Sequence, residues 1–397
     1  MTDSTSKSAS QLRKLVRQAI KEEAFALPSD LPEWTTQMAI AIQQIAAPTF
    51  HEKTRAEYVQ EQFSALQLDE IAMDERFNVY GIMRGSAPER PALMLSAHSD
   101  TVFDYEVDLS TKQDGERIYG PGLGDNSLGV AGLLATGRAL REKQITPGCD
   151  VHFVCTSREE GLGDLGGMRL AYDTLRDRIG AVVNIEGLAY GYVYNRAIAV
   201  RRYKISLQAE GGHSWVHFGR TSAVHGLVEL GHRILTIQVP EEPRTTYNIG
   251  IVEGGLSINT IAASAEMWLD MRSETNEALA NLEQKVQKHI SDLQTDSLHF
   301  HVDVVSDRPS GCVKDDHPLV QIALATLQAQ GTEAGLHTGS TDGNIPMSFG
   351  CPTVTIGMTT GGNAHRKDEY IEVPNIRKGI EQLVHLTLLA ADQIDTF

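Results

Sequence analysis

The stretch from Pro91 to Leu134 constrains the fold of this 397-residue chain more than any other. It opens with a short apolar run of the kind that forms a buried strand, and that run leads directly into His98 and Asp100. A glycine-rich turn at residues 120–124 then ends on Asp125, and apolar residues recur at helical spacing beyond it. The strand thus leads into a histidine and a carboxylate, and the helix begins beside another carboxylate. This combination predicts a metal or catalytic site.

Strand and helix patterns continue to alternate after this stretch as far as about residue 199, and they resume after residue 307. This order predicts an α/β domain with a mixed, largely parallel sheet. In such a sheet, ligands gather at the carboxyl ends of the strands. The predicted strands are 92–95, 151–155, 181–185 and 352–356, and the predicted helices are 127–143, 165–176, 317–330 and 374–396.

The chain before Pro91 contributes further elements to the same domain. Apolar residues at helical spacing predict helices over residues 10–25 and 32–46, and a third helix after His51. Residues 72–84 have the character of a strand that ends at a glycine. A plain loop is predicted over residues 359–368, before the last helix.

Residues 200–307 follow a different pattern, in which strands outnumber helices. The pattern predicts a compact α+β unit with a mostly antiparallel sheet, of the ferredoxin-like kind. We therefore expect a discontinuous α/β domain, 1–199 plus 308–397, interrupted by an inserted domain, 200–307. Within the insertion, strands are predicted at 203–209, 247–252, 262–271 and 300–305, and helices at 223–235 and 274–293.

The composition argues against several kinds of partner. A net charge of −17 at pH 7 disfavours nucleic acid and anionic membranes, because like charges repel. The first ten residues are polar and lack the apolar core of a signal peptide, and no apolar run reaches membrane-spanning length. The four cysteines form no C-x-x-C pair, which is typical of reduced thiols. We therefore expect a cytoplasmic protein.

Seven polar residues within the α/β pattern are candidates for chemistry. Taken singly, each has an ordinary explanation, since a carboxylate after a strand is usually solvated and a single histidine is usually a structural residue. Several carboxylates and two histidines at strand ends and glycine-rich turns are, however, the ligand mixture suited to a pair of divalent metals. The candidates are His98, Asp100, Asp125, Glu159, Glu160, Glu186 and His365.

Five short motifs contain all of these candidates: SAHSDTV at 96–102, GLGDN at 122–126, SREEG at 157–161, NIEG at 184–187 and GNAH at 362–365. In this order the motifs resemble those of the M20 family of co-catalytic zinc metallopeptidases and amidohydrolases. The resemblance covers about residues 30–395. It implies a zinc-exopeptidase catalytic domain with a phosphorylase/hydrolase-like fold and an inserted lid domain.

The resemblance implies five metal ligands. Asp125 would bridge two ions, His98 and Glu186 would complete one site, and Glu160 and His365 would complete the other. Each ion would then have three protein contacts and room for a shared water, which is the open arrangement of a catalytic zinc site. The implied cofactor is Zn²⁺, two ions per subunit, with Co²⁺ or Mn²⁺ as alternatives.

The resemblance also implies two catalytic roles beside the ligands. Asp100 matches the carboxylate that holds the imidazole of His98 and so fixes its tautomer. Glu159 matches the general base, which stands next to a ligand without being one. The peptide bond after the bridging residue, Asp125–Asn126, is expected to be cis.

Further residues match positions that contact the substrate in the family. His213 matches a lid histidine that reaches the oxyanion, often from the other subunit of a dimer, and a turn histidine that caps a strand is the alternative. Arg272 matches a position that grips a carboxylate, although an ion pair within the inserted domain is the alternative. Asn259, Ser340 and Thr341 are the other expected substrate contacts. A homodimer through the inserted domain is implied, although some relatives are monomers.

The resemblance favours a dinuclear zinc exopeptidase that cleaves short peptides with a metal-activated water and Glu159 as general base. Residues 213–223 are more similar to the peptidase-T-like members than to the desuccinylases. An N-acyl-amino-acid amidohydrolase with the same metal centre is the nearest alternative. A non-catalytic binding relative is disfavoured, because all five ligands and Glu159 are present.

Overall fold

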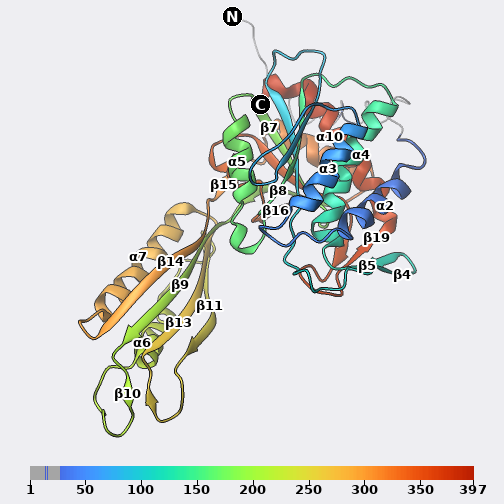
Figure 1. The fold of residues 1–397 in the computed structure, drawn as a ribbon. Coiled ribbons are helices and arrows are strands. Elements are labelled where there is room, and N and C mark those ends of the chain that lie inside the picture. Colours follow the sequence, from blue (N-terminus) through green and yellow to red (C-terminus); the bar gives the residue numbers. More distant parts are fainter. Residues whose placement is uncertain (1–13, 15, 17–26) are drawn as a thin grey trace, which may run out of the picture. The chain divides into compact units, whose positions relative to one another are not determined.

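The structure is a computed structural model that describes residues 14, 16 and 27–397 (Figure 1). The helix predicted over residues 10–25 therefore lies outside the described residues, apart from positions 14 and 16. The chain divides into two compact units, Met1–Ala197 with Cys312–Phe397, and Ile198–Gly311. The second unit is thus inserted in the sequence of the first.

A large mixed sheet forms the centre of the first unit. Its strands are β1 (Asp69–Met73), β2 (Val79–Met83), β3 (Ala92–His98), β6 (Val151–Thr156), β7 (Ile179–Glu186), β8 (Tyr192–Ala197), β15 (Gly311–Cys312), β16 (Gly335–Gly339) and β17 (Thr353–Gly357). Their order is β1-β2-β6-β3-β7-β17-β8-β15, with β16 paired to β8. The central neighbours β6, β3, β7 and β17 run parallel, whereas β1, β2 and β8 pair antiparallel with their neighbours β2, β6 and β17. The predicted α/β fold with a largely parallel sheet is confirmed.

Helices pack on both faces of this sheet. One face carries the helices of the larger apolar cluster, which are α2 (Leu31–Gln43), α3 (Lys53–Ala65), α4 (Leu128–Glu142), α8 (Pro318–Ala329) and α10 (Ile376–Gln393). The other face carries α5 (Gly166–Leu175) and α9 (Asn344–Ser348), which contribute Met168 and Ile345 to a smaller cluster.

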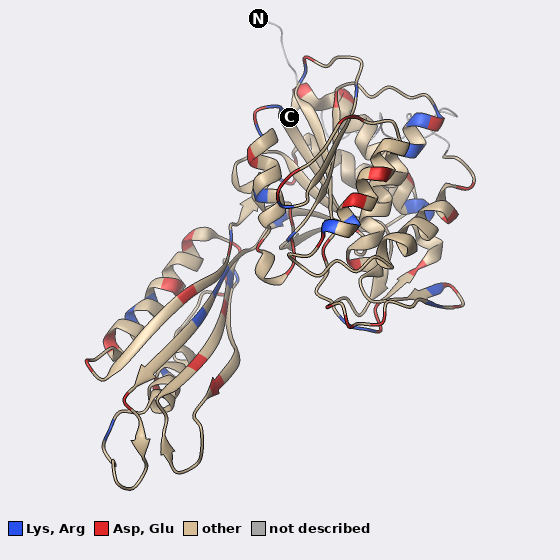
Figure 2. Cartoon of the chain, viewed as in Figure 1, with Lys and Arg blue, Asp and Glu red and all other residues tan. Residues whose placement is uncertain are grey.

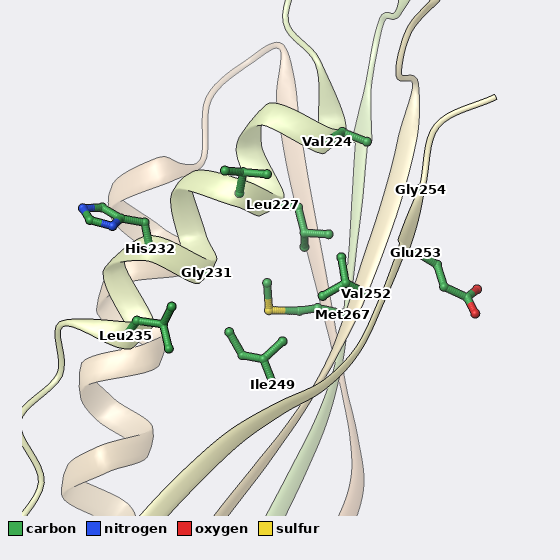
Figure 3. Close-up of a pocket in the computed structure, with 11 residues that line it drawn as sticks. Val224, Leu227, Gly231, His232, Leu235, Ile249, Val252, Glu253, Gly254 and Met267 are labelled. Atoms are coloured by element: carbon green, nitrogen blue, oxygen red, sulfur yellow. The ribbon is translucent and has the colours of Figure 1, made fainter. Parts of the chain in front are cut away.

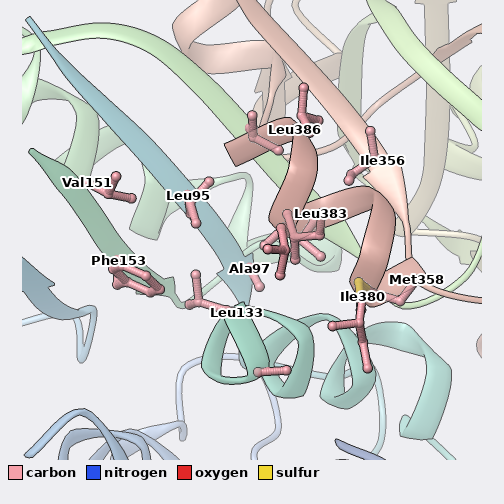
Figure 4. Close-up of a cluster of buried hydrophobic side chains, with 14 of the residues drawn as sticks. Leu95, Ala97, Leu133, Val151, Phe153, Ile356, Met358, Ile380, Leu383 and Leu386 are labelled. Atoms are coloured by element: carbon pink, nitrogen blue, oxygen red, sulfur yellow. The ribbon is translucent and has the colours of Figure 1, made fainter. Parts of the chain in front are cut away.

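Strand β3 shows why the central strands are mostly apolar. Leu95 lies in the larger cluster beside Leu133 of α4 and Leu383 of α10 (Figure 4). Its neighbour Met94 points to the opposite face and packs in the cluster that contains Met168 of α5. Because successive side chains alternate between two covered faces, every position of the strand is buried.

A small second sheet brings two loops of the first unit together. It contains β4 (Lys112–Asp114), β5 (Arg117–Tyr119), β18 (Gly361–Gly362) and β19 (Tyr370–Glu372), in the order β18-β19-β5-β4. The prediction of a plain loop over residues 359–368 was therefore incomplete. The turn that follows β5 contains a cis peptide bond between Asp125 and Asn126, as expected.

The single strand predicted over residues 72–84 is wrong, because this segment is part of the β1–β2 hairpin. The side chain of Asp74 accepts hydrogen bonds from the backbone N–H groups of Arg76 and Asn78. Phe77 in this turn has a left-handed φ of +70°. The turn reverses the chain between the two strands. Asp74 is the sequence signal of this turn, because an aspartate can accept hydrogen bonds from backbone N–H groups a few residues later. The strand pattern around it concealed that signal.

The second unit is a four-stranded antiparallel sheet with two helices. It contains β9 (Ala199–Ala209), α6 (Ala223–Leu235), β11 (Thr245–Gly254), β13 (Ser264–Ser273), α7 (Asn276–Leu293) and β14 (Leu298–Arg308), with the sheet order β11-β13-β9-β14. Tyr203, Ile205 and Leu207 alternate toward the helices and form the core with them. A further pair, β10 (Gly212–His213) and β12 (Thr260–Ile261), joins two loops of this unit.

Charged residues of both signs are interspersed along the elements of each unit (Figure 2). Many form ion pairs within their own unit, such as Arg84 with Asp150 and Lys204 with Glu266. Among the helices of the described residues, none is both long and apolar enough to cross a membrane.

Buried His385 on α10 predicts an acid-sensitive stability. Burial lowers the pKa of His385 from 6.5 to about 4, so the unfolded chain takes up this proton at a higher pH than the folded chain. Its contribution is therefore complete above pH 6.5 and is lost as the pH falls toward 4. Through this histidine, acidification from pH 7 to pH 5 should lower the free energy of unfolding by about 2 kcal/mol.

Urea denaturation of metal-free protein at these two pH values, with and without His385→Leu, measures this contribution. The variant should lose about 2 kcal/mol less on acidification than the unsubstituted chain. Equal losses in the two proteins would show that His385 does not titrate in this way.

Candidate metal centre

Five of the predicted residues converge at one edge of the large sheet. His98 ends β3, Glu186 ends β7, and Glu160 follows the end of β6. Because β3 pairs in parallel with both β6 and β7, the three side chains emerge at the same carboxyl edge. Asp125 comes from the turn before α4, and His365 from the loop between β18 and β19.

Asp125 lies between the two histidines. One of its carboxylate oxygens is 3.2 Å from Nε2 of His98, and the other is 3.1 Å from Nε2 of His365. Nε2 of His98 is also 3.5 Å from Glu186, and Nε2 of His365 is 3.1 Å from Glu160. The side chains therefore form two sets of three that share Asp125.

The electrostatics of this cluster favour bound positive charge. Burial alone would lower the pKa of His98, yet hydrogen bonds with neighbouring carboxylates, chiefly Asp100, hold that pKa well above its ordinary value. Hydrogen bonds with Asp125 and Glu160 raise the pKa of His365 to about 10. Imidazoles that hold protons this tightly indicate an excess of negative charge, which divalent cations would neutralise.

The donor atoms also suit metal ions. Ligand atoms of His98, Asp125 and Glu160 all lie within 4.8 Å of one another. Burial raises the pKa of Glu160 to about 7 and raises that of Glu186 as well, so both carboxylates gain from a cation beside them. Imidazole nitrogen and carboxylate oxygen are the donors that Zn²⁺, Co²⁺ and Mn²⁺ accept. The residues therefore fit a pair of divalent ions.

Asp100 organises the site through two groups. Nδ1 of His98 lies 3.1 Å from the backbone carbonyl oxygen of Asp100, closer than the 3.5 Å to its carboxylate. The carboxylate instead accepts hydrogen bonds from the backbone N–H groups of Glu159 and Glu160, both at 2.9 Å, and from the hydroxyl of Thr49. The carbonyl thus orients the imidazole with Nε2 toward the cluster, and the carboxylate holds the loop that carries Glu159.

Glu159 is buried beside the cluster, with 6% of its surface exposed. Its negative charge helps to raise the pKa of Glu160 and of Asp342, after the larger effect of burial. Asp342 is itself fully buried, and it accepts a hydrogen bond from the hydroxyl of Thr156 at the end of β6. Glu159 therefore lies among the carboxylates of this edge of the sheet.

A series of hydrogen-bonded, buried polar side chains leads to the carboxylate of Glu186. Asn184 donates to Glu186 at 3.2 Å and to the hydroxyl of Thr355 at 3.4 Å, and it accepts a hydrogen bond from Ser96 at 2.9 Å. The hydroxyl of Thr341 lies 3.1 Å from that of Thr355, so this predicted substrate contact belongs to the same series. Ser96, Asn184 and Thr355 were not predicted, although a polar residue inside an apolar strand is a recognisable signal.

The other predicted residues lie elsewhere. Ser340 is half-buried next to Thr341 in the first unit, whereas His213, Asn259 and Arg272 belong to the second unit. Nε of Arg272 donates to Asp270 at 2.7 Å, which is the ion pair foreseen as the alternative to substrate binding. Nδ1 of His213 accepts hydrogen bonds from the backbone of its own turn, and the side chain of Asn259 is exposed.

Comparison with known families agrees with this geometry. Residues 94–388 match the family model of peptidase family M20/M25/M40, and this range contains all five residues of the cluster. The chain belongs to peptidase family M20/M25/M40. Members of the M20 family are hydrolases that act on peptide or amide bonds, so this M20 protein is an enzyme of that class.

Individual relatives of this M20 enzyme are distant in sequence and similar in fold. Acetylornithine deacetylase from Klebsiella pneumoniae is 25% identical over 74% of this chain and 79% of its own. A tripeptidase structure from Staphylococcus aureus is 23% identical, with a TM-score of 0.77 over 91% of this chain and 99% of its own. A dinuclear metal-binding M20 peptidase from Bacillus subtilis, YXEP, is 15% identical, with a TM-score of 0.67 over 93% of this chain and 100% of its own. The M20 fold therefore persists where most residues differ.

Proposed function

We propose that this M20 enzyme hydrolyses a peptide bond in a short peptide with two Zn²⁺ ions held by the five clustered residues. One observation carries the proposal: the two oxygens of Asp125 face His98 and His365, each of which has a second carboxylate beside it. This is the arrangement that two ions with one shared ligand require. The tripeptidase and the dinuclear peptidase of similar fold are consistent with it.

The chemistry follows from the positions of the residues. When bound, the ions would supply Lewis acidity to the scissile carbonyl and lower the pKa of the attacking water. Glu159 takes a proton from this water as its oxygen bonds to the carbonyl carbon. Glu159 then delivers the proton to the leaving nitrogen as the C–N bond breaks, which gives a carboxylate and an amine. Asp100 holds the backbone of Glu159 in place during both transfers.

We assign His213 the role of hydrogen-bond donor to the oxyanion. Its Nδ1 accepts from the N–H groups of Trp215 and Val216 at 3.2 and 3.3 Å, so the neutral imidazole carries its proton on Nε2. That N–H is the kind of donor that stabilises an oxyanion. Capping the turn and donating to substrate are thus compatible roles. An unchanged kcat in His213→Ala would remove His213 from the mechanism.

A substrate panel on zinc-reconstituted enzyme tests the proposal. It compares free tripeptides with N-acetyl and N-succinyl amino acids, and we expect release of a terminal residue from the tripeptides. Hydrolysis of the acylated amino acids alone would instead support an N-acyl-amino-acid amidohydrolase. That alternative is kept because a deacetylase is among the relatives. Asn259, Arg272, Ser340 and Thr341 are proposed substrate contacts, and KM changes in their alanine variants would test them.

We also propose that a second copy of the chain pairs with the second unit. A groove of about 480 Å³ between α6 and β11 is lined by apolar side chains, among them Leu235, Ile249 and Val252 (Figure 3). β11 is an edge strand of the sheet, and the side chains of Val228 and Leu235 are each 66% exposed. Pairing of two β11 edges would satisfy the backbone and cover this surface. A monomer in analytical ultracentrifugation at micromolar concentration would contradict the proposal.

A further inference from the structure

Glu369 occupies an unusual position for a residue in a charged run. It follows Arg366, Lys367 and Asp368 in the sequence, yet its surface is 0% exposed. A buried carboxylate needs hydrogen-bond donors, because leaving its charge unsatisfied would be costly. The donors of Glu369 come from a distant part of the chain.

The side chain of Glu369 accepts three backbone hydrogen bonds from the glycine-rich turn. One oxygen accepts from the N–H groups of Gly124 at 2.6 Å and Asp125 at 2.9 Å, and the other accepts from Gly122 at 3.3 Å. The backbone joins the same segments, since the N–H of Gly120 donates to the carbonyl oxygen of Glu369 at 2.9 Å. Glu369 is therefore the point at which the loop of His365 is tied to the turn of Asp125.

The glycine at position 124 is adapted to this contact. A Cβ atom there would lie 3.2 Å from the Glu369 carboxylate and 2.8 Å from the side chain of Leu188. A larger residue would thus displace the carboxylate from the N–H groups that it accepts. The turn leaves room for Glu369 and directs two of its three N–H donors at one oxygen. Charge-assisted hydrogen bonds of this kind are strong.

We propose that Glu369 is a positioning residue that fixes the backbone of Asp125, and with it the carboxylate shared by the two metal ions. This inference rests on the proposed function. Because Asp125 would serve both ions, the loss of Glu369 should weaken both sites together. Groups that orient ligands in this way typically change metal affinity by about 10- to 100-fold.

Glu372 provides a matched control three positions further along the same segment. Its carboxylate accepts from the hydroxyl of Thr360 at 2.6 Å and pairs with Arg117 at 3.1 Å. These contacts stabilise the small sheet without touching the turn of Asp125. A variant at Glu372 therefore reports what general loosening of this region does.

The experiment compares Glu369→Ala, Glu369→Gln and Glu372→Ala by zinc competition with a chromogenic chelator. Glu369→Ala should bind both zinc ions about 10- to 100-fold more weakly, while Glu372→Ala stays within about threefold of the unsubstituted enzyme. Glu369→Gln keeps an acceptor oxygen for Gly124 and Asp125, so it should recover most of the affinity. Unchanged zinc affinity in a folded Glu369→Ala protein would overturn the inference, and so would a glutamine variant as weak as the alanine variant.

Hydrogen exchange of the metal-free proteins separates this inference from the proposed function. The peptide that spans residues 120–127 should exchange faster in Glu369→Ala than in Glu372→Ala, because three of its N–H groups lose their acceptor. Equal exchange in the two variants would overturn the positioning role even if zinc binds. An unsubstituted chain that binds no zinc would defeat the proposed function, whatever the exchange shows. If Glu369→Ala does not fold, Glu369→Gln and Glu369→Asp allow the same comparison.

Discussion

Glu159→Gln is expected to lower kcat by about 10²- to 10⁴-fold while zinc stays bound, because glutamine cannot take a proton from water. The substitution keeps the shape of the side chain and leaves the backbone N–H that donates to Asp100. It also leaves the five proposed ligand residues in place. Steady-state kinetics on the reconstituted enzyme, with zinc measured by mass spectrometry in the same sample, gives both quantities.

Glu160→Gln is the matched control, since it changes the next residue in the same loop. Glu160 faces His365 at 3.1 Å and is proposed as a ligand, so its substitution should reduce zinc content as well as activity. The two variants therefore separate a base from a ligand. If Glu159→Gln keeps more than a tenth of kcat with zinc bound, another group must accept the proton.

The elements that could be predicted from the sequence are long and have one clear period. The helix predicted at 223–235 coincides with α6, because its apolar residues repeat at helical spacing and pack on one sheet. Strands β4 and β5 could not be found in this way. Each has three residues, too few for a period to appear, and β5 pairs with β19, which lies far away in sequence.

The same limit separates the two kinds of site residue. His98 and Glu186 were predictable because each stands at the end of a mostly apolar strand, and parallel strands bring their ends together. Glu369 was not, because a charged run normally indicates a solvated loop. What buries it is a set of N–H groups in the turn at residues 122–125, and nothing in the sequence shows that this turn faces position 369.

Asp125→Asn is the second change with a large expected effect, since it removes one anionic oxygen from the position between His98 and His365. The amide keeps the size of the side chain, but it offers a single acceptor where two are needed. We expect the zinc content to fall below two ions per chain. Metal ions contribute several kcal/mol to such a reaction, so kcat/KM should fall by about 10³-fold or more.

Asp100→Asn is the control for Asp125→Asn. Both residues face His98, but Asp125 is proposed as the shared ligand and Asp100 as a supporting residue. The carbonyl oxygen of Asp100 that faces His98 is unaffected by this change, and the side chain keeps one acceptor for the loop of Glu159 and Glu160. We expect two ions to remain, bound about 10- to 100-fold more weakly. Calorimetric titration of each metal-free protein with zinc measures the stoichiometry and the affinity of zinc binding together. Two tightly bound ions in Asp125→Asn would mean that Asp125 does not bridge them, and the two sets of ligands would then have to be separate sites.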